Sequence, residues 1–274
     1  MVKIGLALGG GGVRGLALIP MLEVFDELGI RPYRISGTSL GAVMGALYAS
    51  GMSAADIREW MGELLQHDPH HKTRSLKAML RWIKFKDFEF GAEGLFRGDR
   101  FMYLLQEAMG VTRFEELKIP LRVVATDFWE SKQVVLESGE LLPAIRASMS
   151  LPGLFTPVRV GGRVLIDGAG VNPVPHDVLV DCDVVVAIDL MGRMDPMRQG
   201  KPHLFRSILG IFDIMQNAII AEKLKAHPAT IYIKPDIYNV DILDFDKVAQ
   251  VMRQAAPARE QLKRKLETVL KEGL

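Results

Sequence analysis

The sequence predicts an α/β fold in which a mostly parallel central sheet is covered by helices on both faces. Short strand-like segments alternate with longer helical segments along most of the chain. Several strands are continuous apolar runs, such as Val184–Ile188, which is typical of strands buried on both faces of a sheet. The 274 residues, 49% of them hydrophobic and 24% charged, have an ordinary globular composition without an internal repeat or a linker. The economical interpretation is a single domain over residues 1–274.

Periodicity and chain breakers place the individual elements. Residues 158–165 are expected to form a hairpin across Gly161-Gly162, and Pro20 should kink the first helix because it lacks a backbone donor. Further strands are expected at Ile4–Leu8, Tyr33–Ser36, Leu121–Thr126, Gln133–Glu137, Arg163–Ile166, Val184–Leu190 and Ile231–Lys234. Helices are expected at 13–28, 40–50, 53–66, 75–84, 99–109, 174–180, 204–225 and 246–270.

Charge and cysteine content exclude several classes of protein. The net charge of +1 implies no chain-wide attraction to nucleic acid, so nucleic acid is not an expected partner. The lone Cys182 cannot form an intrachain disulfide and has no companions for a metal site, which favours a reducing cytoplasm and no bound metal. Residues 1–8 lack the features of a signal peptide. The apolar segment 204–221 carries charged and amide side chains, so we expect a buried or interfacial helix rather than a membrane span.

The stretch GGGGVRG at residues 9–15 follows the first expected strand and fits the G-x-G-x-x-G pattern of dinucleotide-binding folds. Such a fold needs an acidic residue at the end of the second strand, but Ile35-Ser36 runs directly into Gly37. A phosphate-binding P-loop is also excluded, because no Gly-Lys-Ser/Thr follows the glycines. The glycines can instead expose backbone N–H groups that bind another anion, or they form a tight turn without a catalytic role.

The second glycine motif, Gly37-Thr38-Ser39-Leu40-Gly41, lies between an expected strand and an expected helix. This is G-x-S-x-G in the strand–turn–helix context that presents a nucleophilic serine on a strained turn. The positive end of the following helix points at Ser39 and stabilises a developing anion. Because both glycine loops leave neighbouring strands at the same sheet edge, the N–H groups of the first loop could receive the oxyanion of an acyl intermediate at Ser39.

A serine nucleophile needs a base, and none of the six histidines lies in a setting that marks it as one. His176 is the least easily dismissed, because it follows Asp167-Gly168-Ala169 closely. Asp167 ends an expected strand and is free to face the sheet edge where Ser39 would lie. A turn-forming aspartate is an equally valid interpretation of that spacing.

Three motifs in this order resemble the patatin-like phospholipase family: Gly10–Gly15, Gly37–Gly41 and Asp167–Ala169. The stretch 147–158, ASMSLPGLFTPV, and Asn172-Pro173-Val174-Pro175 also resemble bacterial members. The resemblance covers roughly the first 190 residues. It implies a three-layer patatin-like fold and hydrolysis of an acyl ester in a lipid, without a metal or an organic cofactor.

The resemblance also implies the roles of individual residues. Ser39 would be the nucleophile and Asp167 its base, while Gly10, Gly11 and Gly12 would form the oxyanion hole. Arg14 would brace the glycine loop through carbonyl contacts, an interpretation that we favour over a contact with lipid phosphate. The chain departs from many bacterial members at Leu18, where they have histidine, and at Ala169, where they have a second glycine. Both departures concern substrate preference more than mechanism.

Residues 67–98 interrupt the α/β alternation and form a basic segment that could act as a lid or face a membrane. Within 70–86 there are six lysines and arginines and no acidic residue. An apolar stripe at helical spacing is flanked by Trp82, and a helix of this kind can lie in an anionic membrane interface. The alternative is a surface helix that packs the stripe on the core. The expected membrane contacts are Trp82, Lys77, Arg81 and Lys84.

Two other functions remain open on the sequence. An ordinary α/β-hydrolase would combine Ser39 with a later aspartate such as Asp189 and with His203 or His227, and that chain order is allowed. A non-catalytic scaffold would keep the fold as a binding or regulatory module. The expected enzyme is a cytoplasmic lipid acyl hydrolase that associates peripherally with membrane.

Overall fold

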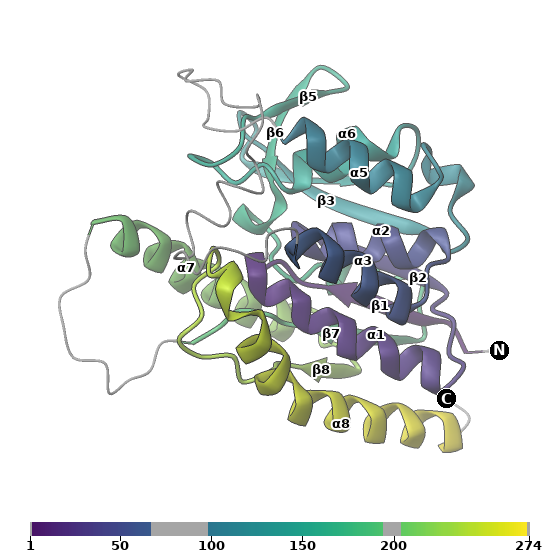
Figure 1. Ribbon diagram of the computed structural model, residues 1–274. Coiled ribbons are helices and arrows are strands. Elements are labelled where there is room, and N and C mark those ends of the chain that lie inside the picture. The colour runs from purple at the N-terminus through teal and green to yellow at the C-terminus, as the bar shows by residue number, and fades with distance from the viewer. Residues whose placement is uncertain (1, 67–97, 194–203, 273–274) are drawn as a thin grey trace.

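The computed structural model describes residues 2–66, 98–193 and 204–272, and a single sheet organises them (Figure 1). Eight strands form this sheet in the order β5-β6-β3-β2-β1-β7-β8, with β4 paired to β3. Strands β3, β2, β1, β7 and β8 are mutually parallel, whereas β4, β5 and β6 are antiparallel to their neighbours. The strands are β1 (Ile4–Leu8), β2 (Arg34–Thr38), β3 (Leu121–Asp127), β4 (Lys132–Leu136), β5 (Val158–Val160), β6 (Arg163–Asp167), β7 (Val184–Ile188) and β8 (Ile231–Ile233).

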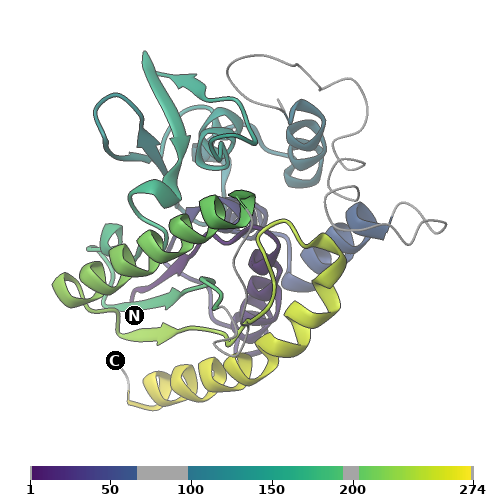
Figure 2. The same cartoon turned by 90° about the vertical axis from the view of Figure 1, so that its left-hand side faces the viewer.

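Helices cover both faces of the sheet, as the sequence predicted. Figure 2 shows α7 on one side of the sheet and α8 on the other, and Figure 1 shows α1 and α2 on the same side as α8. The α-helices are α1 (Leu18–Glu27), α2 (Leu40–Ser50), α3 (Ala54–Gln66), α5 (Asp99–Met109), α6 (Leu141–Ser148), α7 (Leu204–Ala226) and α8 (Val248–Glu272). Among the described residues, no helix is both long enough and apolar enough to cross a membrane.

The alternation of side chains along β1 builds a separate apolar layer on each face of the sheet. Leu6 and Leu8 point into the large core beneath α1, α2 and α8, and both are fully buried. Ala7 points to the opposite face and packs with Ala187 and with Ile220 of α7. A strand that is buried on both sides in this way explains why its sequence is a continuous apolar run.

The expected strands and the hairpin are observed, but two helices differ from expectation. Residues 13–28 divide into a 3₁₀ helix over Gly12–Ala17 and α1, so that Pro20 lies in the first turn of α1, where its missing N–H costs no helical bond. The helix expected at 174–180 is wrong. Only His176–Val178 form a 3₁₀ turn there, because the prolines on either side of Val174 remove donors and disfavour helical backbone. The helix expected at 75–84 lies outside the described residues.

Strand register brings three distant segments to the same edge of the sheet. Leu8 pairs with Gly37, which places the glycine loop and the Ser39 turn side by side at the carboxyl ends of β1 and β2. Thr38 pairs with Val124, and the next residue of β3, Ala125, pairs with Asp167 at the end of antiparallel β6. The three sequence motifs therefore converge although they lie far apart along the chain.

Candidate active site

Ser39 lies on a strained turn between β2 and α2. Its backbone has φ 56° and ψ −127°, a region that residues other than glycine rarely adopt. The glycines on either side permit the turn, because each faces backbone atoms. A Cβ on Gly37 would lie 2.6 Å from Ala42 Cα, and a Cβ on Gly41 would lie 2.2 Å from the carbonyl oxygen of Leu8. Ser39 itself is half-buried and precedes the first turn of α2.

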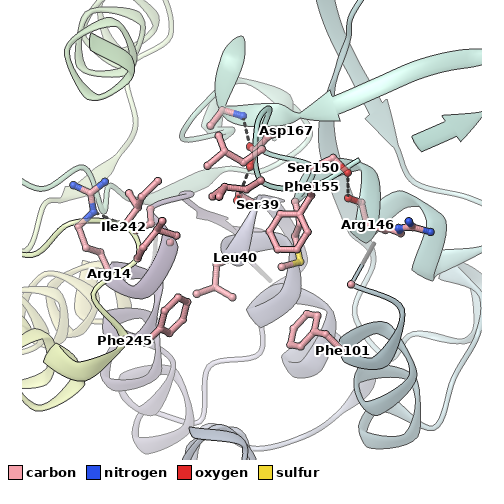
Figure 3. Close-up of a pocket in the computed structure, with 18 of the residues that line it drawn as sticks. Arg14, Ser39, Leu40, Phe101, Arg146, Ser150, Phe155, Asp167, Ile242 and Phe245 are labelled. Carbon is pink, nitrogen blue, oxygen red and sulfur yellow. Dashed lines mark hydrogen bonds between the residues drawn. The ribbon is translucent and has the colours of Figure 1, made fainter. Parts of the chain in front are cut away.

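Asp167 contacts the Ser39 hydroxyl directly (Figure 3). The Ser39 Oγ donates a hydrogen bond of 2.8 Å to Asp167 Oδ2, and the N–H of Ala169 donates one of 2.8 Å to Oδ1. The backbone of Asp167 is fixed by pairing with β3 and by the Thr126 hydroxyl, which donates to its carbonyl oxygen at 2.8 Å. The carboxylate is therefore held against the hydroxyl by contacts on several sides.

Burial changes the acidity of this carboxyl. Asp167 is only 4% exposed, and desolvation raises its pKa from 3.8 to about 6, while the hydrogen bonds from Ala169 and Ser39 act in the opposite direction. A carboxylate with a pKa near 6 is a stronger base than an exposed aspartate and is still ionised at pH 7. Its protonation state thus suits proton transfer from a hydroxyl.

If Asp167 is the base that the resemblance implies, hydrolysis of an ester at Ser39 should depend on pH through this carboxyl. Protonated Asp167 cannot accept the Ser39 proton, so kcat/KM for a short soluble ester should fall about tenfold per pH unit below a pKa near 6. Rates measured between about pH 4.5 and pH 8 with a substrate that does not ionise test this expectation. A rate that stays constant down to about pH 5 would contradict it, because the base would then have an ordinary carboxyl pKa.

The glycine loop lies beside Ser39, but Gly10 does not fit the role expected for it. The Gly10 N–H already donates to the carbonyl oxygen of Pro173 at 3.0 Å. No hydrogen bond within the described part of the chain uses the N–H of Gly11 or Gly12, and both residues line the cavity that contains Ser39. Gly10 provides space instead, since a Cβ there would lie 3.2 Å from the Ser39 Cβ.

Arg14 contacts the carbonyl side of the same loop. Its Nε donates to the Gly11 carbonyl oxygen at 3.1 Å, and its Nη2 forms an ion pair of 3.0 Å with Asp213 of α7. The guanidinium is 2% exposed, so a buried charge is paired with a carboxylate and bound to a carbonyl. This is the contact that the bracing interpretation requires, and it also joins the glycine loop to α7.

A largely apolar cavity of about 160 Å³ opens at Ser39 and Asp167 (Figure 3). Carbon-rich side chains from several elements surround the polar pair, including Leu40 of α2, Phe101 of α5 and Phe155 beyond α6. The surface exposed to the cavity is mostly apolar, although Arg100, Arg146 and Gln216 also line it. A cavity with an apolar wall and a reactive pair at one end fits a hydrocarbon chain with a polar linkage.

Sequence reasoning missed the contribution of the C-terminal region to this cavity. Ile242, Leu243 and Phe245 line it, and the Ile242 carbonyl oxygen accepts the Val13 N–H at 2.9 Å. A Cβ on Gly12 would lie 2.2 Å from that same carbonyl oxygen, so Gly12 is needed for the contact. No local pattern around residue 242 predicts a role, because the contact depends on the tertiary fold.

The histidine alternatives do not assemble around Ser39 among the described residues. His176 is buried, with Nδ1 2.9 Å from the Val174 carbonyl oxygen, and it does not line the cavity. Asp189 is fully buried and is bound by Lys234 at 2.9 Å and by the Tyr232 hydroxyl, and it does not line the cavity either. His227 is exposed just beyond the end of α7.

Four of the six histidines, His67, His70, His71 and His203, lie outside the described residues. The expected membrane contacts Trp82, Lys77, Arg81 and Lys84 lie outside them as well. Within the described ranges, no group of three histidine, cysteine, aspartate or glutamate side chains could hold a metal ion.

Comparison with known proteins identifies the family to which the chain belongs. Residues 6–180 match the family model described as patatin-like phospholipase. The chain belongs to the patatin-like phospholipase family. The match begins in β1 and ends beyond the Asp167 turn, so it contains the three motifs at the sheet edge.

Relatives of the family are similar over most of this chain. An uncharacterised NTE family protein of Mycobacterium tuberculosis, Rv1063c, is 32% identical over 223 residues, which cover 77% of this chain and 58% of that protein. Lysophospholipase NTE1 of Candida glabrata is 30% identical over 285 residues, which cover 92% of this chain and 16% of that protein. The chain thus spans less than two thirds of the length of these relatives.

The fold is similar to that of a solved protein structure. The crystal structure of VipD from Legionella pneumophila superposes with a TM-score of 0.53 at 14% identity and covers 96% of this chain and 66% of that chain. At this level of identity the likeness shows the fold alone, a central sheet flanked by helices.

Proposed function

We propose that this patatin-like protein is a serine hydrolase that cleaves carboxyl esters of lipids. Ser39 acts as the nucleophile and Asp167 as its base. The observation that carries the proposal is the 2.8 Å hydrogen bond from Ser39 Oγ to Asp167 Oδ2 at the end of an apolar cavity. Family membership supports the same conclusion independently.

In the first step Ser39 Oγ attacks the ester carbonyl carbon while its proton passes to Asp167 Oδ2. A bond forms between Oγ and the carbonyl carbon, and the carbonyl oxygen becomes an oxyanion. Collapse of this intermediate breaks the bond to the alcohol, which leaves with the proton held by Asp167. The product of this half-reaction is an acyl-serine.

The N–H groups of Gly11 and Gly12 hold the oxyanion in this proposal. They are free of hydrogen bonds to other described residues, and they lie beside Ser39 in the cavity wall. The N-terminus of α2, which begins at Leu40, adds a favourable dipole. One such donor contributes about 3–4 kcal/mol to transition-state stabilisation. Arg14 orients the loop through its bond to the Gly11 carbonyl oxygen.

Water completes the cycle by the reverse sequence of proton transfers. Asp167 takes a proton from the attacking water, a second oxyanion forms at the glycine loop, and the acyl-serine bond breaks. The Ser39 Oγ recovers its proton from Asp167, and a carboxylic acid is released. No group other than those of the chain and water is needed to balance either half-reaction.

The cavity supports a lipid as the source of the acyl group. Its wall is formed mainly by aliphatic and aromatic side chains, which bind an acyl chain by burying apolar surface. The name of one relative, a lysophospholipase, is consistent with this substrate class. The proposal also includes peripheral contact with anionic membrane through the basic segment 70–86, in the cytoplasm.

Hydrolysis of a panel of phospholipids, lysophospholipids and triacylglycerols, together with labelling by a fluorophosphonate probe, tests the proposed function. We expect fatty acid release and labelling at Ser39 by the wild-type protein, and neither by Ser39→Ala. A Ser53→Ala variant is the matched control, because Ser53 lies at the start of α3 and does not line the cavity. A folded wild-type protein without either reaction would favour the non-catalytic scaffold.

A further inference from the structure

The segment Ser148–Ser150, part of the stretch ASMSLPGLFTPV, contacts the backbones of both Ser39 and Asp167. It lies at the end of α6, and both serines are buried. The proposed chemistry assigns it no role, since neither serine donates or accepts a proton in the reaction. The hydrogen bonds of this segment nevertheless connect it to both Ser39 and Asp167.

The Ser39 backbone depends on a side chain for its N–H. The strained turn costs of the order of 1–3 kcal/mol, and such a conformation persists only where its surroundings hold it. Its carbonyl oxygen accepts the N–H groups of Ala42 and Val43 at the start of α2, at 2.9 and 3.3 Å. Its N–H donates to the Ser148 Oγ at 2.8 Å. The hydroxyl of Ser148 therefore holds the other side of the strained residue.

The hydrogen bonds of the Ser148 hydroxyl have one possible direction. A backbone N–H only donates, so Oγ must accept from Ser39 and has a single proton left to donate. That proton goes to the Val124 carbonyl oxygen at 2.6 Å. Val124 belongs to β3 and pairs with Thr38, so the hydroxyl ties the end of β2 to the neighbouring strand. The single proton of the hydroxyl is therefore used, and a change of the Ser148 rotamer would break both bonds.

The same segment holds the base. The Ser150 carbonyl oxygen accepts the Asp167 N–H at 2.9 Å. Gly168 packs against the Val124 carbonyl oxygen, to which a Cβ would approach within 2.2 Å. The acceptor of the Ser148 hydroxyl thus also borders the turn that follows the base. The backbone N–H groups of the nucleophile and of the base are therefore both bonded to the short segment Ser148–Ser150.

We infer that Ser148 is a positioning residue of the acyl-transfer site. Its Oγ fixes the strained Ser39 backbone so that the Ser39 hydroxyl remains on the Asp167 carboxylate. The inference rests on the proposed function and identifies what the ASMSLPG stretch does for it. Ser148 acts through the geometry of Ser39, and its own hydroxyl takes no part in bond formation.

Ser148→Ala tests the inference, with Ser36→Ala as its matched control. Ser36 is an equally buried serine on β2 whose hydroxyl donates to the Pro175 carbonyl oxygen at 2.7 Å, and it does not line the cavity. Ser148→Ala loses two buried hydrogen bonds and Ser36→Ala loses one, so both variants should lose thermal stability and Ser148→Ala somewhat more. Only Ser148→Ala frees the backbone of Ser39, so only this variant should impair the reaction.

The measurements are kcat and KM for a soluble ester and the rate constant of fluorophosphonate labelling. For Ser148→Ala we expect kcat and the labelling rate to fall about 10- to 100-fold with KM nearly unchanged. The pH below which kcat/KM falls should remain near 6, because Asp167 stays buried. For Ser36→Ala both rates should stay within about threefold of the wild type.

Wild-type rates in Ser148→Ala, or an equal loss of kcat in Ser36→Ala, would overturn the inference. A wild-type protein that neither hydrolyses esters nor labels at Ser39 would overturn the proposed function instead, so the two failures are distinguishable.

Discussion

Replacing Asp167 by asparagine is expected to abolish ester hydrolysis and, at neutral pH, to stabilise the fold. The amide is nearly the same size as the carboxyl, and its oxygen can still accept the Ala169 N–H. It cannot take the proton of Ser39, because the amide nitrogen donates where the carboxylate oxygen accepted. With the base removed, kcat/KM should fall by at least about 10³-fold, as it does when serine hydrolases lose the group that supports their nucleophile.

The gain in stability follows from the raised pKa. Below about pH 3 the Asp167 carboxyl is protonated in both the folded and the unfolded chain, so its burial carries no ionisation penalty. As the pH rises from 3.8 to about 6, the unfolded chain ionises while the buried carboxyl keeps its proton, so stability is lost over this range and the loss is complete above the folded pKa. A rise in the pKa of Asp167 from 3.8 to about 6 lowers the free energy of unfolding by roughly 3 kcal/mol at neutral pH. Asparagine does not ionise, so the variant avoids this loss.

Urea unfolding of wild type and Asp167→Asn at about pH 3 and about pH 7.5 measures this difference. The free energies of unfolding should agree at the acidic pH, and the variant should be more stable at the higher one. Asp189→Asn is the control, and its effect on the free energy of unfolding should have the opposite sign, because the fully buried Asp189 is paired with Lys234 at 2.9 Å. That variant should lose stability and keep its activity, since Asp189 does not line the cavity.

The same pair of variants separates the two hydrolase mechanisms. If Ser39 worked through a histidine and Asp189, activity would be lost in Asp189→Asn and in His227→Ala or His203→Ala, and Asp167→Asn would remain active. If Asp167→Asn retained even a tenth of the wild-type kcat/KM, it would contradict the role of Asp167 as base.

The fold was predictable where local patterns report burial. Continuous apolar runs such as Val184–Ile188 identify strands covered on both faces, and the G-x-S-x-G context identified the turn at Ser39. The failure at 174–180 is also local. Proline on both sides of Val174 outweighs the apolar spacing, and the chain forms only a short 3₁₀ turn at His176–Val178.

The parts of the candidate site that the sequence did not predict depend on contacts between distant segments. The glycines of residues 9–12 indicate an anion-binding loop, but only the fold shows that the Gly10 N–H is bonded to Pro173. Ile242 closes against Gly12 from the opposite end of the chain, and the buried Arg14 meets Asp213 of α7. Neither contact leaves a periodic signal, because each involves one residue per segment.

Replacing Gly41 by alanine is expected to destabilise the protein strongly. The added Cβ would lie 2.2 Å from the Leu8 carbonyl oxygen and 2.6 Å from that of Gly9. Both atoms belong to backbone at the end of β1, which is held by pairing on both sides, so α2 must move away. We expect a loss of roughly 3 kcal/mol or more in the free energy of unfolding, and displacement of Ser39 in any folded fraction.

Gly45→Ala provides the matched control one turn later in the same helix. Its Cβ would meet only side-chain atoms, at 3.1 Å from Ile35 and 3.2 Å from Leu121, and these can shift slightly. Alanine also has a helix propensity about 1 kcal/mol better than that of glycine, which offsets the crowding. Thermal and urea unfolding of the two variants should therefore differ widely although the substitution is the same. Equal stability would show that α2 can move away from β1 at little cost, and the G-x-S-x-G glycine would then have no packing role.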